Sequence, residues 1–212
     1  MFLVEHMESS APQAGAEAAT PALAYSAVVI GASAGGISAL MTVLEGLPAN
    51  FALPILVVQH IAAEKASQLP AVLGWRTRLA VKWAEDGEIA EAGTVYIAPP
   101  DQHLLLQAGG RLVLSSADRV DFWRPAIDVL FESAVDTYGS GVAAVILSGM
   151  MWDGAKGIAA VAKGGGITIV QDEATSRYFE MPTAALDFGH ADLMMSPPRI
   201  AQALGVLAEV VA

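Results

Sequence analysis

AVVIGASAGGISALMTVL, residues 27–44, is the stretch that decides the fold. Its first residues, Ala27 to Ile30, are apolar and largely β-branched, a pattern that predicts a buried strand. The glycine-rich run from Gly31 to Gly36 predicts a tight turn. Beyond it the apolar residues recur at helical spacing, which predicts a helix over residues 37–47. A buried strand that passes through a glycine turn into a helix is typical of α/β proteins.

The same alternation continues along most of the chain. Further buried strands are expected at residues 55–58, 95–98, 142–147 and 167–170, and shorter ones at 81–83 and 193–195. Helices are expected from Leu69 with an interruption near Pro70, over 125–138 with Pro125 in the first turn, over 154–163, after Pro182 and over 198–211. Strands at 103–107 and 111–114, joined by Gly109 and Gly110, predict an antiparallel hairpin. The predicted fold class is therefore α/β, a doubly wound and mostly parallel sheet with helices on both faces and an antiparallel hairpin portion.

The composition excludes several classes of protein. The chain has 212 residues, enough for one domain with a full core. Its net charge of −11 disfavours nucleic acid and anionic lipid as partners. No apolar run approaches the ~20 residues of a membrane-spanning helix, so no membrane insertion is expected. The chain has no cysteine, which excludes disulfides, thiolate nucleophiles and cysteine-based metal sites.

The chain is expected to divide into a tail and one domain. Residues 1–24 are rich in Ala, Pro, Ser and Glu without apolar periodicity, which predicts a disordered tail before a single domain over residues 25–212. The first residues lack the basic region of a signal peptide, so a cytoplasmic protein is expected.

Three residues with catalytic chemistry follow three of the predicted strands. Ser33 follows the first strand, His60 the second, and Asp153 comes shortly after the strand at 142–147. Ligands of doubly wound sheets bind beyond the carboxyl ends of the strands, so these three side chains are expected at one edge. Serine, histidine and aspartate are the groups of an acyl-transfer triad. The spacing Gly31-x-Ser33-x-Gly35 also fits a nucleophile elbow, in which the serine projects from a strand-to-helix turn.

Each of these residues also has a purely structural interpretation. Ser33 could cap the following helix or belong to a phosphate-binding turn. An NAD site, however, has an acidic residue at the end of the second strand, where this chain has Gln59-His60. His60 could be an ordinary histidine at a strand end, and Asp153 could cap the helix that starts near Gly154. The histidine spacing offers no metal site, and no cofactor is expected. For three arginines the default interpretation is solvated surface: Arg119, Arg124 and Arg177.

Several motifs in order together resemble the CheB-type protein-glutamate methylesterases of bacterial chemotaxis. The matching stretches are Val29–Gly36, Val57–His60, Tyr96–His103, Arg124–Asp128, Leu147–Met150 with Asp153-Gly154, and Met181–Ala185. They cover roughly residues 26 to 200, and several motifs in register are more specific than any single one.

The resemblance implies an activity and a set of site residues. It implies a triad of Ser33, His60 and Asp153 that hydrolyses γ-glutamyl methyl esters on receptors and, in some members, deamidates glutamine. It implies an oxyanion site with backbone near His60 and Met150. The remaining residues implied are Ala34, Gly35 and Met150 lining the site, and Arg124 and Met181 binding substrate. Members often carry a receiver domain that this chain does not show before its first strand, so a separate regulatory protein in trans is expected.

Some residues depart from the family pattern and leave other functions open. Ala34 stands where threonine is common, Met151 and Trp152 where smaller residues are usual, and Glu180 where glycine is common. These departures support an alternative in which the domain is a binding or regulatory module with weak or no catalysis. An α/β-hydrolase with Ser33, Asp153 and His190 is a further alternative, as is a nucleotide-binding domain.

Overall fold

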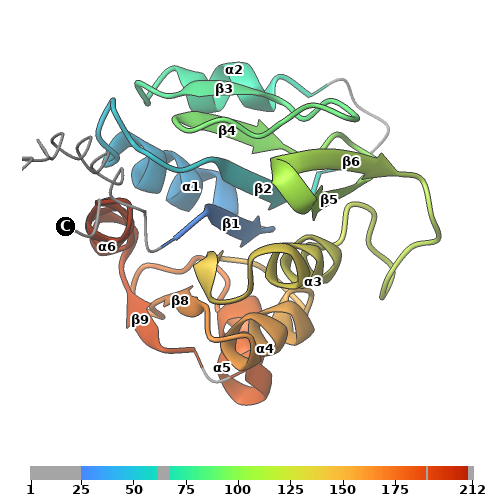
Figure 1. Cartoon of the computed structure of the whole chain (residues 1–212). Helices are drawn as coiled ribbons and strands as arrows, with labels where there is room; N and C mark the ends of the chain where they lie inside the picture. Colours follow the sequence, from blue (N-terminus) through green and yellow to red (C-terminus); the bar gives the residue numbers. More distant parts are fainter. Residues whose placement is uncertain (1–24, 62–66, 190, 210–212) are drawn as a thin grey trace, which may run out of the picture.

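The computed structural model describes residues 25–61, 67–189 and 191–209. Seven strands form one sheet in the order β3-β4-β2-β1-β7-β8-β9, and every neighbouring pair in it is parallel (Figure 1). Its strands are β1 (Ala27–Ala32), β2 (Ile55–Gln59), β3 (Ala80–Trp83), β4 (Thr94–Ile97), β7 (Val142–Ile146), β8 (Ile167–Gln171) and β9 (Leu193–Met195). The central strands β1, β2 and β7 are buried throughout, as expected of strands covered on both faces.

Helices cover both faces of the sheet. Their bounds are α1 (Gly36–Glu45), α2 (Leu69–Gly74), α3 (Ile127–Tyr138), α4 (Ala155–Lys163), α5 (Glu180–Gly189) and α6 (Pro197–Leu207). The core on one face includes Leu40 of α1, Leu73 of α2 and Leu204 of α6. The core on the other face includes Phe131 of α3 and Ile158 of α4. The molecule is therefore a three-layer α/β domain, and the predicted fold class is confirmed.

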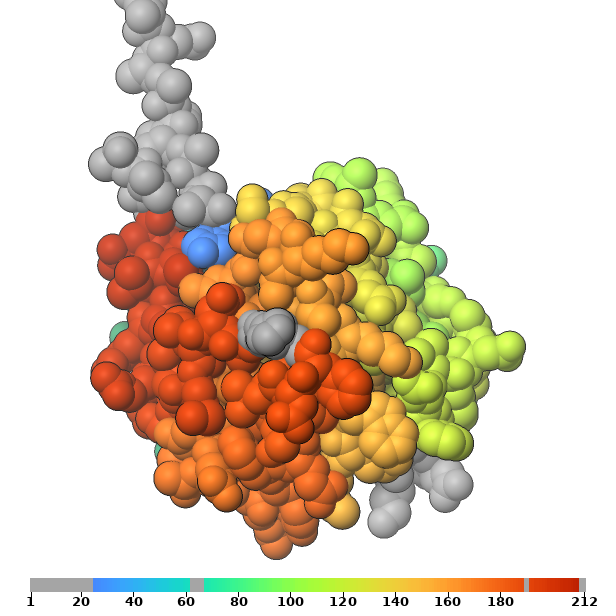
Figure 2. All heavy atoms as spheres, turned by 90° about the horizontal axis from the view of Figure 1, so that it is seen from below, coloured from blue at the N-terminus to red at the C-terminus, as the bar shows by residue number. Residues whose placement is uncertain are grey.

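The antiparallel hairpin is a separate two-stranded sheet. Strands β5 (His103–Gln107) and β6 (Arg111–Ser115) pair with each other, and the apolar side of the hairpin joins the core of α3 through Leu104 and Leu112. Seen from the side of α4 and α5, the two helices (orange) occupy the middle of the surface, and the hairpin (green) lies at its edge (Figure 2).

Two helix starts differ from the sequence predictions because of proline. Pro70 does not interrupt a helix: it occupies the first turn of α2, where its missing N–H costs nothing. Pro125, by contrast, is not in the first turn of α3, because Ala126 is the N-cap and Pro125 precedes it. The predicted tail over residues 1–24 lies outside the described residues. The last helix was expected to run to residue 211, but α6 ends at Leu207 with Ala208 as its C-cap, so that bound is wrong. Within the described residues no helix combines the length and the apolar character needed to cross a bilayer.

Candidate active site

The strand order places a crevice between β1 and β7. The chain leaves β1 toward β2 on one side and leaves β7 toward β8 on the other, so these neighbours mark a topological switch point. Ligands bind at such points, beyond the carboxyl ends of the strands. Ser33 follows β1, and the loop 147–154 follows β7. The N–H of Ser33 donates to the carbonyl of Ser148 at 3.1 Å, so the two segments are joined at their exits.

The turn after β1 holds Ser33 at the edge of the sheet. Gly35 has φ 74°, a left-handed conformation that a side chain would strain, and it is the N-cap of α1. Because Gly35 occupies the cap position, the interpretation of Ser33 as the helix cap is wrong. The Ser33 side chain is thereby left for another partner.

His60 lies within hydrogen-bond distance of both Ser33 and Asp153. The Ser33 Oγ lies 3.1 Å from His60 Nδ1, and His60 Nε2 lies 2.8 Å from Asp153 Oδ2. The histidine and aspartate side chains are only 5% and 1% exposed, so water screens this contact little. With Nε2–H donating to the carboxylate, Nδ1 is the nitrogen that can accept the serine proton. Chemically, three groups in this arrangement can serve as a nucleophile, a general base and an orienting acid.

Asp153 also caps a helix that its position in the sequence does not indicate. Its Oδ2 also accepts from the N–H of Ile127 at 2.7 Å, and its Oδ1 accepts from the N–H of Asp128 at 3.1 Å. The carboxylate therefore caps α3, whereas the predicted cap of its own helix is wrong because Gly154 is the N-cap of α4 without a side-chain bond. The carboxylate accepts three hydrogen bonds in all, one from His60 and two from backbone N–H groups of α3.

Two strand-end glutamines fasten the loops of the site. Gln59 Nε2 donates to the carbonyls of Ser33 at 2.9 Å and His60 at 3.1 Å, so one amide bridges the backbones of nucleophile and base. Gln171, at the end of β8, accepts from the N–H of Ser148 through its Oε1 at 2.8 Å. The Ser148 hydroxyl in turn donates to the carbonyl of Ala34 at 2.8 Å.

Trp123 lies flat against the imidazole ring of His60. Its ring centroid is 3.9 Å from that of His60, and the planes differ by 1°. Sequence reasoning missed this residue because it lies in the irregular segment before α3 and follows no strand. An aromatic face favours a nearby cation, so Trp123 suits an imidazole that becomes charged during a reaction.

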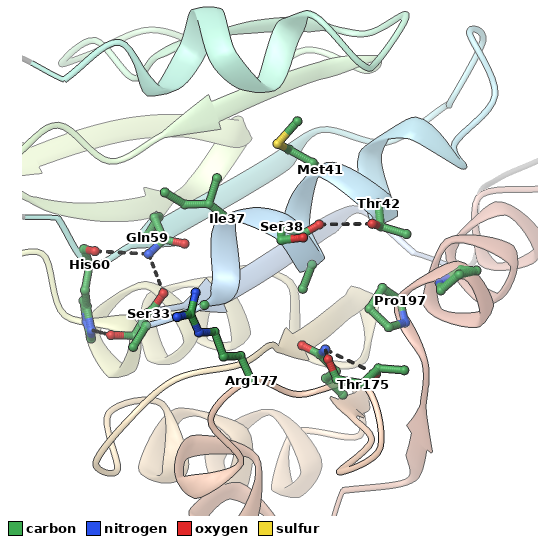
Figure 3. A pocket seen from close by; sticks show the side chains of 15 residues that line it. Ser33, Ile37, Ser38, Met41, Thr42, Gln59, His60, Thr175, Arg177 and Pro197 are labelled. Atoms are coloured by element: carbon green, nitrogen blue, oxygen red, sulfur yellow. Dashed lines mark hydrogen bonds between the residues drawn. The ribbon is translucent and has the colours of Figure 1, made fainter.

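An open cleft of about 880 Å³ extends from Ser33 along α1 (Figure 3). Ala34 and Gly35 line it, as predicted for the site, and so do Gln59 and His60. Its far end is lined by Pro197 and Pro198 at the start of α6. Its volume is that of a site for a small molecule or a few residues of a peptide.

Met150 and Met181, which were also predicted for the site, lie near Ser33 and make no hydrogen bond to it. Met150 is 44% exposed beside the loop of Asp153 and does not line the cleft. Met181 is 1% exposed and packs against Gly149, so in this conformation it supports the loop from beneath. The resemblance implies backbone near His60 in the oxyanion site. The N–H of His60 itself already donates to the carbonyl of Ala32 at 3.0 Å.

Arg124 is engaged in a local network. Its Nε and Nη2 donate to the two carboxylate oxygens of Asp101 at 3.0 and 2.9 Å, and its Nη1 donates to the carbonyls of Ser116 and Ala117. The hydrogen bonds from Arg124 hold the pKa of the Asp101 carboxyl below its usual value. Arg124 thus fixes the segment that carries Trp123, a structural role that the predicted surface position did not include.

The departures at Met151 and Glu180 contact each other. The N–H of Met151, whose φ is 68°, donates to Glu180 Oε2 at 3.0 Å.

Among the described residues no three His, Cys, Asp or Glu side chains are grouped to hold a metal ion. His190, the base of the α/β-hydrolase alternative, lies outside the described residues.

Comparisons with known proteins identify the family of this chain. The family model described as CheB methylesterase matches residues 28–204. A relative from Leptospira interrogans is 40% identical over 178 residues, which are 84% of this chain and 92% of that protein. Protein-glutamate methylesterase/protein-glutamine glutaminase 2 of Anaeromyxobacter dehalogenans is 45% identical over 177 residues, 84% of this chain and 52% of that protein.

A solved structure has the same fold. The crystal structure of the Thermotoga maritima CheB methylesterase catalytic domain superposes with a TM-score of 0.83 at 40% identity, over 86% of this chain and 98% of that one. The chain spans nearly all of the Leptospira relative but about half of the Anaeromyxobacter relative. The chain belongs to the CheB methylesterase family of carboxylic ester hydrolases.

Proposed function

We propose that this chain hydrolyses γ-glutamyl methyl esters on a methylated chemotaxis-type receptor or another methylated protein, with Ser33 as nucleophile. The observation that carries the proposal is the continuous set of hydrogen bonds from Ser33 through His60 to Asp153 at the switch point of the sheet. The substrate class comes from the relatives, which are named protein-glutamate methylesterases.

The geometry supports a two-step reaction. Ser33 Oγ attacks the ester carbonyl while its proton passes to Nδ1 of His60, and Asp153 stabilises the imidazolium. The carbon–methoxy bond then breaks, the imidazolium returns the proton to the leaving oxygen, and methanol departs. A water molecule attacks the acyl-serine with the same base, which releases the glutamate carboxylate and restores Ser33.

The transition state needs donors for the oxyanion. We assign these to backbone N–H groups around Ala34 and Gly35, where the first turn of α1 brings the positive end of the helix dipole to the nucleophile. The backbone around Met150, next to Gly149 and Ser33, completes the site. Substrate binding by Arg124 and Met181 stays a prediction, and in this conformation the two residues position the segments around the triad.

A second reaction uses the same residues. With a glutamine side chain as substrate, ammonia leaves in place of methanol, and the acyl-serine is identical. The relatives named for both activities favour this candidate. Methanol and ammonia release from matched peptides separates the two activities. Control by a regulatory protein in trans remains a prediction.

Ser33→Ala tests the nucleophile, with Ser140→Ala as a matched control because Ser140 is exposed in the short 3-10 turn before β7, at the end of that strand opposite to the site. We expect Ser33→Ala to fold normally, to release no methanol from a methylated receptor and to escape labelling by a fluorophosphonate probe. Ser140→Ala should keep both properties. Undiminished turnover by Ser33→Ala would exclude the mechanism, and an unlabelled, inactive wild-type protein would favour the binding-module alternative.

A further inference from the structure

Arg177 lies over the turn that carries the nucleophile. A Cβ atom added to Gly35 would lie 2.7 Å from Arg177 Cβ and 3.2 Å from Arg177 Cδ, so the stem of the arginine packs on the glycine backbone. The residue lines the same cleft as Ser33, and Figure 3 shows its guanidinium directed toward Ser33. Its position beside the reacting group is therefore set by close packing.

The charge of Arg177 is left without an acidic partner among the described residues. Five other described cations form ion pairs with carboxylates: Arg76, Lys82, Arg119, Arg124 and Lys156. The remaining described cations without an ion pair do not line the cleft: Arg78, Arg111, Lys163 and Arg199. The contact seen for Arg177 is with the Tyr178 ring, 5.8 Å from the guanidinium carbon. The described residues that line the cleft include no aspartate or glutamate. In a chain of net charge −11, this leaves a cation that can take an anion from a ligand.

We infer that Arg177 is a specificity-determining residue that binds a free carboxylate on the substrate, next to the methyl ester. The inference rests on the proposed function. The ester itself is neutral, so a cation beside Ser33 has no partner in the reacting group before hydrolysis. A guanidinium pairs with a carboxylate through two parallel hydrogen bonds, which a neutral side chain cannot match. The chain would thereby select methyl esters that lie in acidic segments of a protein.

Two peptides test this inference. Each carries one γ-glutamyl methyl ester, flanked by glutamates in the acidic peptide and by serines in the neutral one. We expect the wild-type protein to prefer the acidic peptide about tenfold in kcat/KM, mainly through KM, and added salt to reduce the preference. Arg177→Gln should abolish the preference, whereas Arg78→Gln, which removes the same charge from an exposed site away from the cleft, should keep it. Arg177→Glu should prefer a peptide flanked by lysines.

The outcomes separate this inference from the proposed function. Release of methanol from both peptides with equal kcat/KM by the wild-type protein would overturn the role of Arg177 alone. An equal loss on both peptides in Arg177→Gln would also overturn it, because the arginine would then serve the reacting group or the fold. Hydrolysis of neither peptide by the wild-type protein would overturn the proposed function itself.

Discussion

Replacing Asp153 with asparagine tests whether one carboxylate both orients His60 and caps α3. The two oxygens of Asp153 accept three hydrogen bonds, from His60 Nε2 and the N–H of Ile127 on Oδ2 and from the N–H of Asp128 on Oδ1. An asparagine has one oxygen and one NH₂ group, so in either orientation the NH₂ group faces an N–H group. The substitution thus weakens the cap of α3 in either orientation, and it also disturbs the bond to His60 where the NH₂ group takes the place of Oδ2.

The magnitudes follow from burial. Asp153 is 2% exposed, so an N–H left without an acceptor costs about 1–3 kcal/mol of unfolding free energy. The alanine variant leaves both Ile127 and Asp128 without their acceptor, and we expect a loss of roughly 2–5 kcal/mol. Loss of the negative charge and of the imidazole orientation should lower kcat by roughly 10³- to 10⁴-fold in the asparagine variant.

Urea unfolding and ester turnover, measured on the same preparations, separate the two effects. Ser33→Ala is the control, because it removes the nucleophile while the cap stays intact, and its stability should remain within about 1 kcal/mol of the wild type. The cap would be refuted if Asp153→Asn unfolded at the wild-type urea concentration. Turnover above a tenth of the wild-type rate would refute the orienting role.

Three further predictions concern residues around the triad. Burial, with a contribution from nearby Asp153, raises the pKa of the Asp128 carboxyl from its usual 3.8 to about 6. The folded state therefore binds this proton more tightly than the unfolded state, and stability falls by up to about 3 kcal/mol as pH rises from 4 to above 6. Asp128→Asn should remove that slope in unfolding experiments and be the more stable protein at pH 8; an unchanged slope would contradict the assignment. Trp123→Ala should lower kcat up to about tenfold, because it removes the ring stacked on His60, and Trp123→Phe should keep most of the wild-type kcat. Steady-state kinetics measure this effect, and equal rates in the wild type and Trp123→Ala would contradict it. Gly149→Ala should lose stability and turnover, because its Cβ would meet Met181 Sδ and lie 2.9 Å from the Ser33 Cβ; adding Met181→Ala should recover part of the stability, and a harmless single variant would contradict the close packing.

The fold could be predicted from the sequence because its information is local. The apolar runs that became β1, β2 and β7 are short, β-branched and buried on both faces, and they differ from the helical stretches in period. The strand-end rule then placed Ser33, His60 and Asp153 together, although they are separated by up to 120 residues of chain.

The contacts that refine the site could not be predicted, because they join segments without a periodic pattern. Nothing near Asp153 in sequence indicates that its carboxylate caps α3 rather than α4. The stacking of Trp123 depends on how an irregular segment folds back over His60. Arg177 resembles any exposed arginine until its packing on Gly35 is known.

Three of the departures from the family pattern, at Met151, Trp152 and Glu180, form one local change, and the contacts of His60 with Ser33 and Asp153 stay in place. Glu180, at the first turn of α5, accepts the N–H of Met151 and is adjacent to a groove of about 600 Å³ lined by Trp152 and Phe188. A glycine at position 180 would have no carboxylate to hold that N–H, so Glu180 stabilises the left-handed residue two positions before Asp153. The bulkier residues of this loop and the acid that fixes it therefore belong together. Because Asp153 still faces His60 at 2.8 Å, the change remodels the rim of the site and gives no support to a module without catalysis.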